Sequence, residues 1–234
     1  MNEKKARPRV LLFDIECTNL AANFGYILSI AWKWAGRGRV QSIDITQAPR
    51  FDRDPTDDSW LIRTFREIVE EADIIVGHYS TKFDYPFLQA RALYHELPLF
   101  PTDIKHIDTW RISRQKLKLN SNRLASLAAH LGVEEKTPLS GPIWIKAMAG
   151  HAKSIRYVVE HNRQDVIVLE QCYDRIKGLN WDNPKVSVEK GSCPTCGSFN
   201  IRLRGKRRTT RANVQRFSCN SCGHWSCLPQ SPER

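Results

Sequence analysis

Hydrophobic residues at the start of the chain form short runs bounded by glycine-containing turns. Runs at 9–15, 26–34 and 39–45 have the length and composition of β-strands, and the segments 23–25 and 36–38 between them are typical of tight turns. Because the connections are short, we expect these three strands to pair as an antiparallel meander.

Beyond this meander the hydrophobic period becomes that of helices alternating with short strands. Helices are predicted at 57–71, 84–94, 121–131 and 154–176, and short strands at 74–77 and 106–108. A meander followed by alternating helices and strands predicts an α/β fold, in which a mixed sheet with antiparallel and parallel strands is flanked by helices.

The segment 178–184 breaks the longest predicted helix and precedes a change in composition. We therefore expect one domain at 1–180 and a second, smaller one at 181–234. The chain is 41% hydrophobic and 26% charged, and it has no apolar run near the ~18 residues that a membrane span needs. With no secretory signal at its start, the chain is expected to be cytoplasmic and not membrane-bound.

Charge is distributed unevenly along the chain. The formal net charge is +11, of which residues 183–234, with ten basic and two acidic side chains, contribute +8 and the rest only +3. A basic tail on a nearly neutral body indicates catalysis in the body and nucleic-acid binding in the tail.

Four acidic residues are candidates for catalysis. Asp14 and Glu16 share one face of a strand that is otherwise apolar, where two carboxylates need cations unless the strand is a solvated edge. Asp84 begins a predicted helix, where its negative charge could instead only stabilise the helix through the helix dipole. Asp165 lies one helical turn after His161, which could equally form a surface pair with it.

Taken together, the segments 13–16, 77–92 and 161–166 resemble the three motifs of the DEDD 3′-to-5′ exonucleases of the RNase H-like superfamily. They are most similar to the proofreading domains of family B DNA polymerases and their free-standing relatives. The resemblance covers roughly residues 9–175 and implies an RNase H-like sheet.

This resemblance also implies a two-metal mechanism. Two divalent cations about 4 Å apart can ionise a water molecule and stabilise the leaving oxygen of a phosphodiester, and hard cations such as Mg²⁺ or Mn²⁺ prefer carboxylate ligands. By the resemblance, Asp14, Glu16 and Asp165 hold the metal that carries the attacking water. Asp14 also helps to hold the second metal, which Asp84 reaches directly or through water.

The sequence departs from its relatives at the general base. Relatives usually have Tyr four residues before the last Asp, or His five residues before it, whereas this chain has His161 at the first position and Glu160 at the second. A neutral imidazole accepts protons near pH 7, so His161 is the predicted base. Tyr79 stands where relatives commonly have Asn. Asp108 is a rival metal ligand, although it could instead cap a helix.

Contacts to nucleic acid are expected at two further places. By the resemblance, Thr18, Asn19 and Leu20 follow the first motif and could touch the scissile nucleotide. Lys118, Asn122 and Arg123 could track a phosphate backbone, or their face could simply be solvated.

The tail contains two Cys-x₂-Cys pairs separated by 22 residues, each pair followed by Gly. This spacing predicts a zinc ribbon in which Cys193, Cys196, Cys219 and Cys222 hold one structural Zn²⁺. Two disulfides would require an oxidising compartment, for which nothing else in the chain argues.

A basic run between the cysteine pairs predicts a hairpin that binds nucleic acid. Phe199, Phe217 and Trp225 lie near this run and could stack a base. A protein partner of the ribbon is the alternative. The candidate residues are Arg204, Lys206, Arg207, Arg208 and Arg211.

These features predict a metal-dependent 3′-to-5′ exonuclease acting on single-stranded or frayed DNA, with the ribbon capturing substrate. The preference for DNA over RNA rests on the resemblance alone. Two rivals remain open: an RNase H-like endonuclease or RNA exonuclease, and an inactive nucleic-acid-binding adaptor, which the departures at His161 and Tyr79 would suit.

Overall fold

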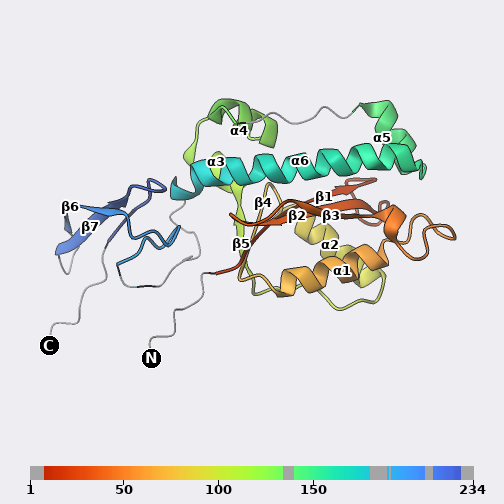
Figure 1. Cartoon of the computed structure of the whole chain (residues 1–234), viewed down its shortest axis with the longest axis horizontal. Helices are drawn as coiled ribbons and strands as arrows, with labels where there is room; N and C mark the ends of the chain where they lie inside the picture. The colour runs from red at the N-terminus through yellow and green to blue at the C-terminus, as the bar shows by residue number, and fades with distance from the viewer. Residues whose placement is uncertain (1–7, 134–139, 180–188, 190, 209–212, 228–234) are drawn as a thin grey trace.

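A mixed sheet between two layers of helices forms the body of the protein, and a small antiparallel sheet lies beyond the end of the longest helix (Figure 1). The computed structural model describes residues 8–133, 140–179, 189, 191–208 and 213–227.

The large sheet has the strand order β3-β2-β1-β4-β5. Its strands are β1 (Val10–Cys17), β2 (Ile27–Trp34), β3 (Gln41–Asp44), β4 (Ile74–Gly77) and β5 (Lys105–Asp108). The first three form the predicted antiparallel meander, while β4 pairs in parallel with both β1 and β5. The predicted mixed sheet is therefore confirmed. The carboxyl ends of β1, β4 and β5 meet at one edge of it.

Helices cover both faces of this sheet (Figure 1). On one side lie α3 (Thr109–Lys116), α4 (Leu124–Leu131), α5 (Gly141–Met148) and α6 (Ala152–Ile176); on the other lie α1 (Ser59–Glu70) and α2 (Asp84–Tyr94). Single 3₁₀ turns follow β3 (Ile45–Gln47) and α6 (Lys177–Leu179).

Two of these helices, α3 and α5, have no predicted range in the sequence analysis. Among their residues α3 buries only Thr109, Ile112 and Ser113 and α5 only Ala147, so neither shows an apolar stripe of helical period. Helix α4 is equally short but buries Leu124, Leu127 and Ala128. The helix predicted at 121–131 begins three residues late, at Leu124.

Strand β1 separates the two halves of the core. Leu11, Phe13 and Ile15 pack with α1 and α2, and the Phe13 and Phe65 rings lie 5.5 Å apart. Leu12 packs on the other side with residues of α6. Because side chains alternate along a strand, Asp14 and Glu16 share the face of Leu12 and point toward α6.

A buried ion pair holds α2 against the sheet. Asp58 is fully buried and accepts hydrogen bonds from the Arg91 guanidinium, at 2.8 Å from its terminal nitrogen, and from the backbone N–H of Ile27 in β2. His95 Nε2 lies 2.6 Å from the same carboxylate. A buried pair of this kind strongly disfavours loss of either partner, so it fixes the position of the helix that Asp84 begins.

The turn after β4 depends on the absence of a side chain at Gly77. A Cβ there would lie 2.3 Å from Ser80 Oγ. The Ser80 hydroxyl is instead hydrogen-bonded to His106 Nε2 at 2.8 Å. Burial lowers the pKa of His106 to about 4, although the carboxylate of Asp108 opposes this shift, while Arg111 adds to it.

The small C-terminal sheet consists of β6 (Ile201–Arg208), β7 (Asn213–Cys219) and β8 (Trp225–Cys227), in that order and antiparallel. It contacts the body at Gly178, whose carbonyl accepts a hydrogen bond from His224 Nδ1 at 3.0 Å. A Cβ on Gly178 would lie 1.9 Å from the carbonyl oxygen of Cys222, so the contact requires glycine. The boundary predicted at 180/181 lies outside the described residues. None of the described helices has the length and apolar character of a membrane-spanning one.

The partly buried His106 makes the stability of the protein depend on pH. Its pKa is about 4 in the folded protein against about 6.5 when unfolded. Unfolding therefore takes up a proton between these values, and the stabilisation is complete above pH 6.5 and is lost as the pH falls toward 4. The lowering corresponds to at most about 3 kcal/mol, of which about 2 kcal/mol is lost between pH 7 and pH 5. Urea unfolding at both pH values should show a smaller loss for His106→Gln than for the wild type. Equal losses would contradict this assignment.

Candidate active site

Three side chains converge where the carboxyl end of β1 faces the middle of α6. Glu16 Oε1 and Asp165 Oδ2 each lie 3.8 Å from His161 Nε2. The potential ligand atoms of these three residues all lie within 4.8 Å of one another. Oxygen ligands ~2.1 Å from one cation stand ~3–4 Å apart, so this spacing fits a shared divalent ion.

Asp14 lies beside this cluster and is held by a residue that the sequence analysis missed. The Asn162 side-chain amide donates to Asp14 Oδ2 at 2.8 Å, and its own carbonyl oxygen accepts from the Ser29 hydroxyl at 2.8 Å. Asn162 is fully buried. One signal could have identified it: it is an amide on the inner, otherwise largely apolar face of the long helix, three residues before Asp165.

Asp84 approaches the same strand from the other helical layer. Its side chain is almost completely buried, and Asp84 Oδ1 accepts a hydrogen bond from the Ile15 backbone N–H, between Asp14 and Glu16, at 3.2 Å. Burial raises the pKa of Asp84 to about 7, and the charge of Asp108 adds to the shift. The structure thus gathers all four predicted acids around the end of β1, with Asp14 and Asp84 outside the tight cluster of Glu16, His161 and Asp165.

Electrostatics at this place favour cations. The pKa of the neighbouring Cys17 thiol rises to about 12, first because of burial and then because of the negative charges of Glu16, Asp84 and Asp14. His161 Nδ1 is buried, and no group in the described part of the chain forms a hydrogen bond with it. Carboxylate oxygens together with one imidazole suit divalent cations, so the chemistry of the donor set fits a metal centre.

Glu160 and His161, the two candidate positions for the general base, have different surroundings. Glu160 has a side chain that is 74% exposed and pairs with Arg163 at 3.9 Å. His161, whose side chain is 14% exposed, points into the carboxylate cluster.

Asp108 caps the N-terminus of α3, which is the role predicted for it as the alternative to binding metal. Its Oδ1 accepts hydrogen bonds from the backbone N–H groups of Trp110 and Tyr79, both at 2.9 Å, and its Oδ2 accepts from Thr81. This network holds Tyr79 in the left-handed region, at φ 64°, a conformation that is uncommon for a residue other than glycine. His78, in the same turn, is hydrogen-bonded to Thr109 and to the carbonyl of Asn122.

The predicted nucleotide contacts occupy different environments. Thr18 Oγ1 accepts from the Tyr26 N–H, and Asn19 Oδ1 accepts from the Ala21 N–H, so both side chains shape the loop. Leu20 is 85% exposed beside them. Asn122 Oδ1 accepts a hydrogen bond from Ser113 at 2.7 Å.

The four predicted cysteine ligands form a second cluster. Cys193 and Cys222 have their sulfur atoms 3.7 Å apart, and Cys196 and Cys219 have theirs 3.6 Å apart. A disulfide requires ~2 Å, whereas four sulfurs ~2.3 Å from a tetrahedral zinc lie ~3.8 Å apart. Hydrogen bonds from Cys196 and Cys222 lower the pKa of Cys193, while the pKa of Cys222 is raised. The cluster therefore suggests zinc.

The strand register of the ribbon brings basic and aromatic residues together. Arg204 pairs across the sheet with Arg216, and Ser218 pairs with Trp225. The two guanidinium carbons lie 5.5 and 4.9 Å from the centroid of the Trp225 ring, which is 39% exposed. Arg216 belongs to the predicted basic hairpin, but the packing of both guanidinium groups against Trp225 could not be predicted, because it depends on strand register.

The other predicted residues of the ribbon fall into three groups. Lys206, Arg207 and Arg208 are exposed along β6, Phe217 is buried in the ribbon core and cannot stack a base, and Arg211 lies outside the described residues.

Comparison with known proteins concerns the body of the chain. A model of the RNase H superfamily matches residues 11–177. Among solved structures, the chain is similar to the family B DNA polymerase from the hyperthermophilic archaeon Pyrobaculum calidifontis, with 21% sequence identity and a TM-score of 0.57. The match covers 74% of this chain but only 25% of the polymerase chain, so this protein spans about a quarter of the polymerase's length. At this identity the likeness concerns the fold, and no curated protein matches the chain.

The cysteine cluster should hold one zinc ion per chain. Metal analysis of the purified wild type is expected to find about one equivalent of zinc, and Cys196→Ser should lose most of it, because a tetrahedral site with three thiolates binds far more weakly. Cys172→Ser removes a thiol outside the cluster and is the matched control. Full zinc content in Cys196→Ser would contradict the assignment.

Proposed function

Because the chain belongs to the RNase H superfamily, we propose that it is a metal-dependent 3′-to-5′ exonuclease that hydrolyses the phosphodiester bonds of single-stranded or frayed DNA. The family implies a nuclease that uses divalent metal on a nucleic-acid substrate. The observation that carries the proposal is the convergence of Glu16, His161 and Asp165 within 4.8 Å, with Asp14 and Asp84 beside them.

In this proposal the four acids hold two Mg²⁺ or Mn²⁺ ions. Asp14, Glu16 and Asp165 hold one, and Asp14 with Asp84 holds the other. When bound, such ions polarise the phosphodiester and lower the pKa of water. Asn162 orients Asp14 through its hydrogen bond to Oδ2 of that carboxylate.

His161 is the proposed general base. Its Nε2 is directed at Glu16 and Asp165, so a water molecule held between the carboxylates and a phosphodiester would lie within reach of this nitrogen.

The proposed 3′-to-5′ direction and the proposed DNA substrate are based on similarity to other proteins. The three motifs resemble those of 3′-to-5′ proofreading exonucleases, and the similar solved structure is that of a DNA polymerase. An endonuclease, an RNA exonuclease and an inactive adaptor are distinct outcomes of the experiment below.

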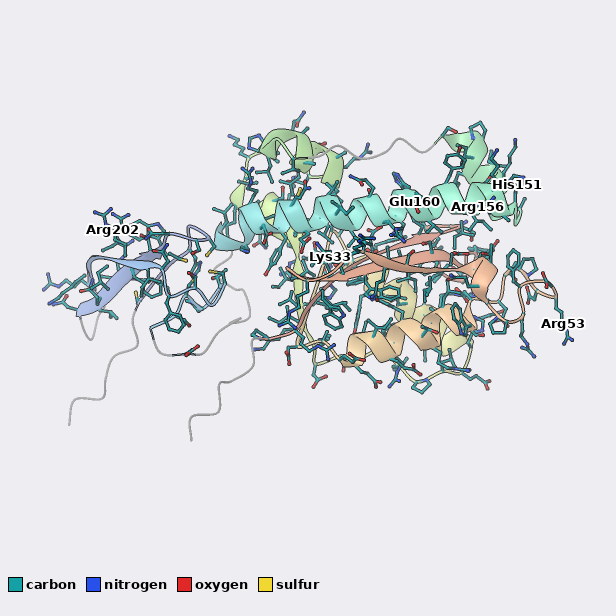
Figure 2. All side chains as sticks on the ribbon, in the orientation of Figure 1. Lys33, Arg53, His151, Arg156, Glu160 and Arg202 are labelled. Atoms are coloured by element: carbon teal, nitrogen blue, oxygen red, sulfur yellow. The ribbon has the colours of Figure 1, made fainter. Side chains whose placement is uncertain are left out.

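The zinc ribbon is proposed as a separate nucleic-acid-binding domain, 181–234, following a catalytic domain at 1–180. Its face with Arg204, Arg216 and Trp225 combines cations for phosphates with an exposed ring for a base. Figure 2 shows Arg202 of the same strand on this ribbon, at the opposite end of the molecule from Arg53.

The catalytic proposal predicts a ladder of products. With 5′-labelled single-stranded DNA and Mg²⁺ or Mn²⁺, the wild type should shorten the substrate from its 3′ end. Asp14→Ala should reduce the rate roughly 10³-fold or more, because a metal contribution of several kcal/mol is lost. His161→Ala should reduce it roughly 10²-fold while binding Mn²⁺ as the wild type does.

The matched control is Asp52→Ala, which removes an exposed carboxylate elsewhere and should leave the rate unchanged. Cleavage of circular DNA would instead indicate an endonuclease, and a ladder only from labelled RNA an RNA exonuclease. Binding without cleavage by the wild type would indicate the adaptor. Weakened Mn²⁺ binding by His161→Ala would make His161 a ligand.

The ribbon proposal predicts weaker capture without slower chemistry. Trp225→Ala should raise KM for long single-stranded DNA roughly tenfold with kcat unchanged, because stacking on one base contributes ~1–3 kcal/mol. Leu203→Ala, on the opposite face of β6, is the control, and both variants must retain zinc. If KM is unchanged and a protein partner is lost instead, the ribbon binds protein.

A further inference from the structure

A cavity beside the first turns of α3 is not used by the proposed chemistry. Its volume is about 390 Å³, and it opens between the turn after β4 and the outer side of α3. The lining residues are Thr81, Lys82, Trp110, Arg111, Arg114 and Gln115.

The cavity is strongly cationic. Lys82, Arg111 and Arg114 are exposed, and none of them forms an ion pair with any residue that the structure describes. The nearest carboxylate of the turn, Asp108, is buried, and its oxygens are occupied by backbone N–H groups and by Thr81. Three like charges around a hollow, with the single neighbouring carboxylate among the described residues, that of Asp108, buried and hydrogen-bonded within the turn, leave a net positive charge that favours an anionic ligand.

Two aromatic side chains, Tyr79 and Trp110, lie next to these cations. The Tyr79 ring packs edge-on against Trp110, with centroids 5.0 Å apart, and Tyr79 is 43% exposed. Asp108 holds the Tyr79 backbone in its left-handed conformation, so the ring is kept in place by the fold. An exposed ring next to several cations offers one surface for a base and another for phosphates.

The cavity lies at the same edge of the sheet as the candidate active site. The turn after β4 and the start of α3 lie at the same edge of the sheet as the carboxyl end of β1. Helix α3 also packs on the α6 side, since Ile112 shares a core cluster with Val166. Strand β5 is two strands from β1, a separation of ~10 Å, and a stacked strand covers this distance in about three nucleotides.

We propose that this cavity binds internucleotide phosphates of the strand being degraded, about three nucleotides from the scissile bond, with Tyr79 and Trp110 against a base. This inference rests on the proposed nuclease function. It assigns Lys82, Arg111 and Arg114 to substrate positioning and predicts that they act only on substrates long enough to reach them.

The test compares Arg111→Ala/Arg114→Ala with the wild type on single-stranded DNA of two to twelve nucleotides. For the twelve-mer, kcat/KM should fall roughly tenfold or more, as expected for lost charge-assisted contacts, while cleavage of the dinucleotide should be unchanged. The variant effect should first appear at about four or five nucleotides.

Equilibrium binding provides a readout that does not need catalysis. With a fluorescent twelve-mer in EDTA, the slope of log K against log salt should be smaller by ~1.4 in the variant, because each lost phosphate contact on a single strand contributes ~0.7. Arg53→Ala/Arg63→Ala is the charge-matched control, since both arginines are exposed and outside the cavity.

Three results would overturn the inference: an unchanged salt slope, equal loss on dinucleotide and twelve-mer, or the same loss in the control variant. Failure of the proposed function has a different signature. In that case the wild type would cleave nothing, while the difference in salt slope between variant and wild type would persist.

Discussion

Mutual repulsion between closely placed carboxylates is the constraint on which the arrangement of this protein depends. Three of the acids at the end of β1 are held in different ways: Asp14 by Asn162 of α6, Asp84 by the backbone of β1, and Asp165 by its place on α6, where its Oδ2 lies 3.8 Å from His161 Nε2. The two helical layers must therefore stay locked to the sheet. The buried Asp58–Arg91 pair does this for α2, and the Ser29–Asn162 hydrogen bond does it for α6.

Helix α6 connects the two functions proposed for this chain. It contributes His161 and Asp165 to the candidate active site, and the 3₁₀ turn at its end carries Gly178, against which the ribbon packs. Twelve residues of helix separate Asp165 from Lys177, a distance of ~18 Å. The ribbon therefore packs directly against the end of the helix that carries the candidate catalytic residues.

The two departures from the related exonucleases occur at structurally consistent places. His161 is partly buried, and its Nε2 lies 3.8 Å from both Glu16 Oε1 and Asp165 Oδ2, whereas the neighbouring Glu160 is exposed. Tyr79 adopts a strained backbone conformation that Asp108 stabilises, and its ring rests on Trp110. Both departures therefore concern groups that would face water or substrate, while the acids themselves match the family pattern.

The mixed sheet and most of the helices could be predicted from local hydrophobic period, and the cysteine cluster from its short, fixed spacing. The four acids were singled out by motifs in separate segments, and their catalytic roles stay predictions. The helices α3 and α5 were not assigned ranges, since they bury too few apolar residues to show a helical period. Only the tertiary structure decided that Asn162 supports Asp14, that Asp108 caps a helix, that Phe217 is buried and that Arg204 and Arg216 flank Trp225. These relations depend on which strands and helices become neighbours and in what register, and a linear pattern does not contain that information.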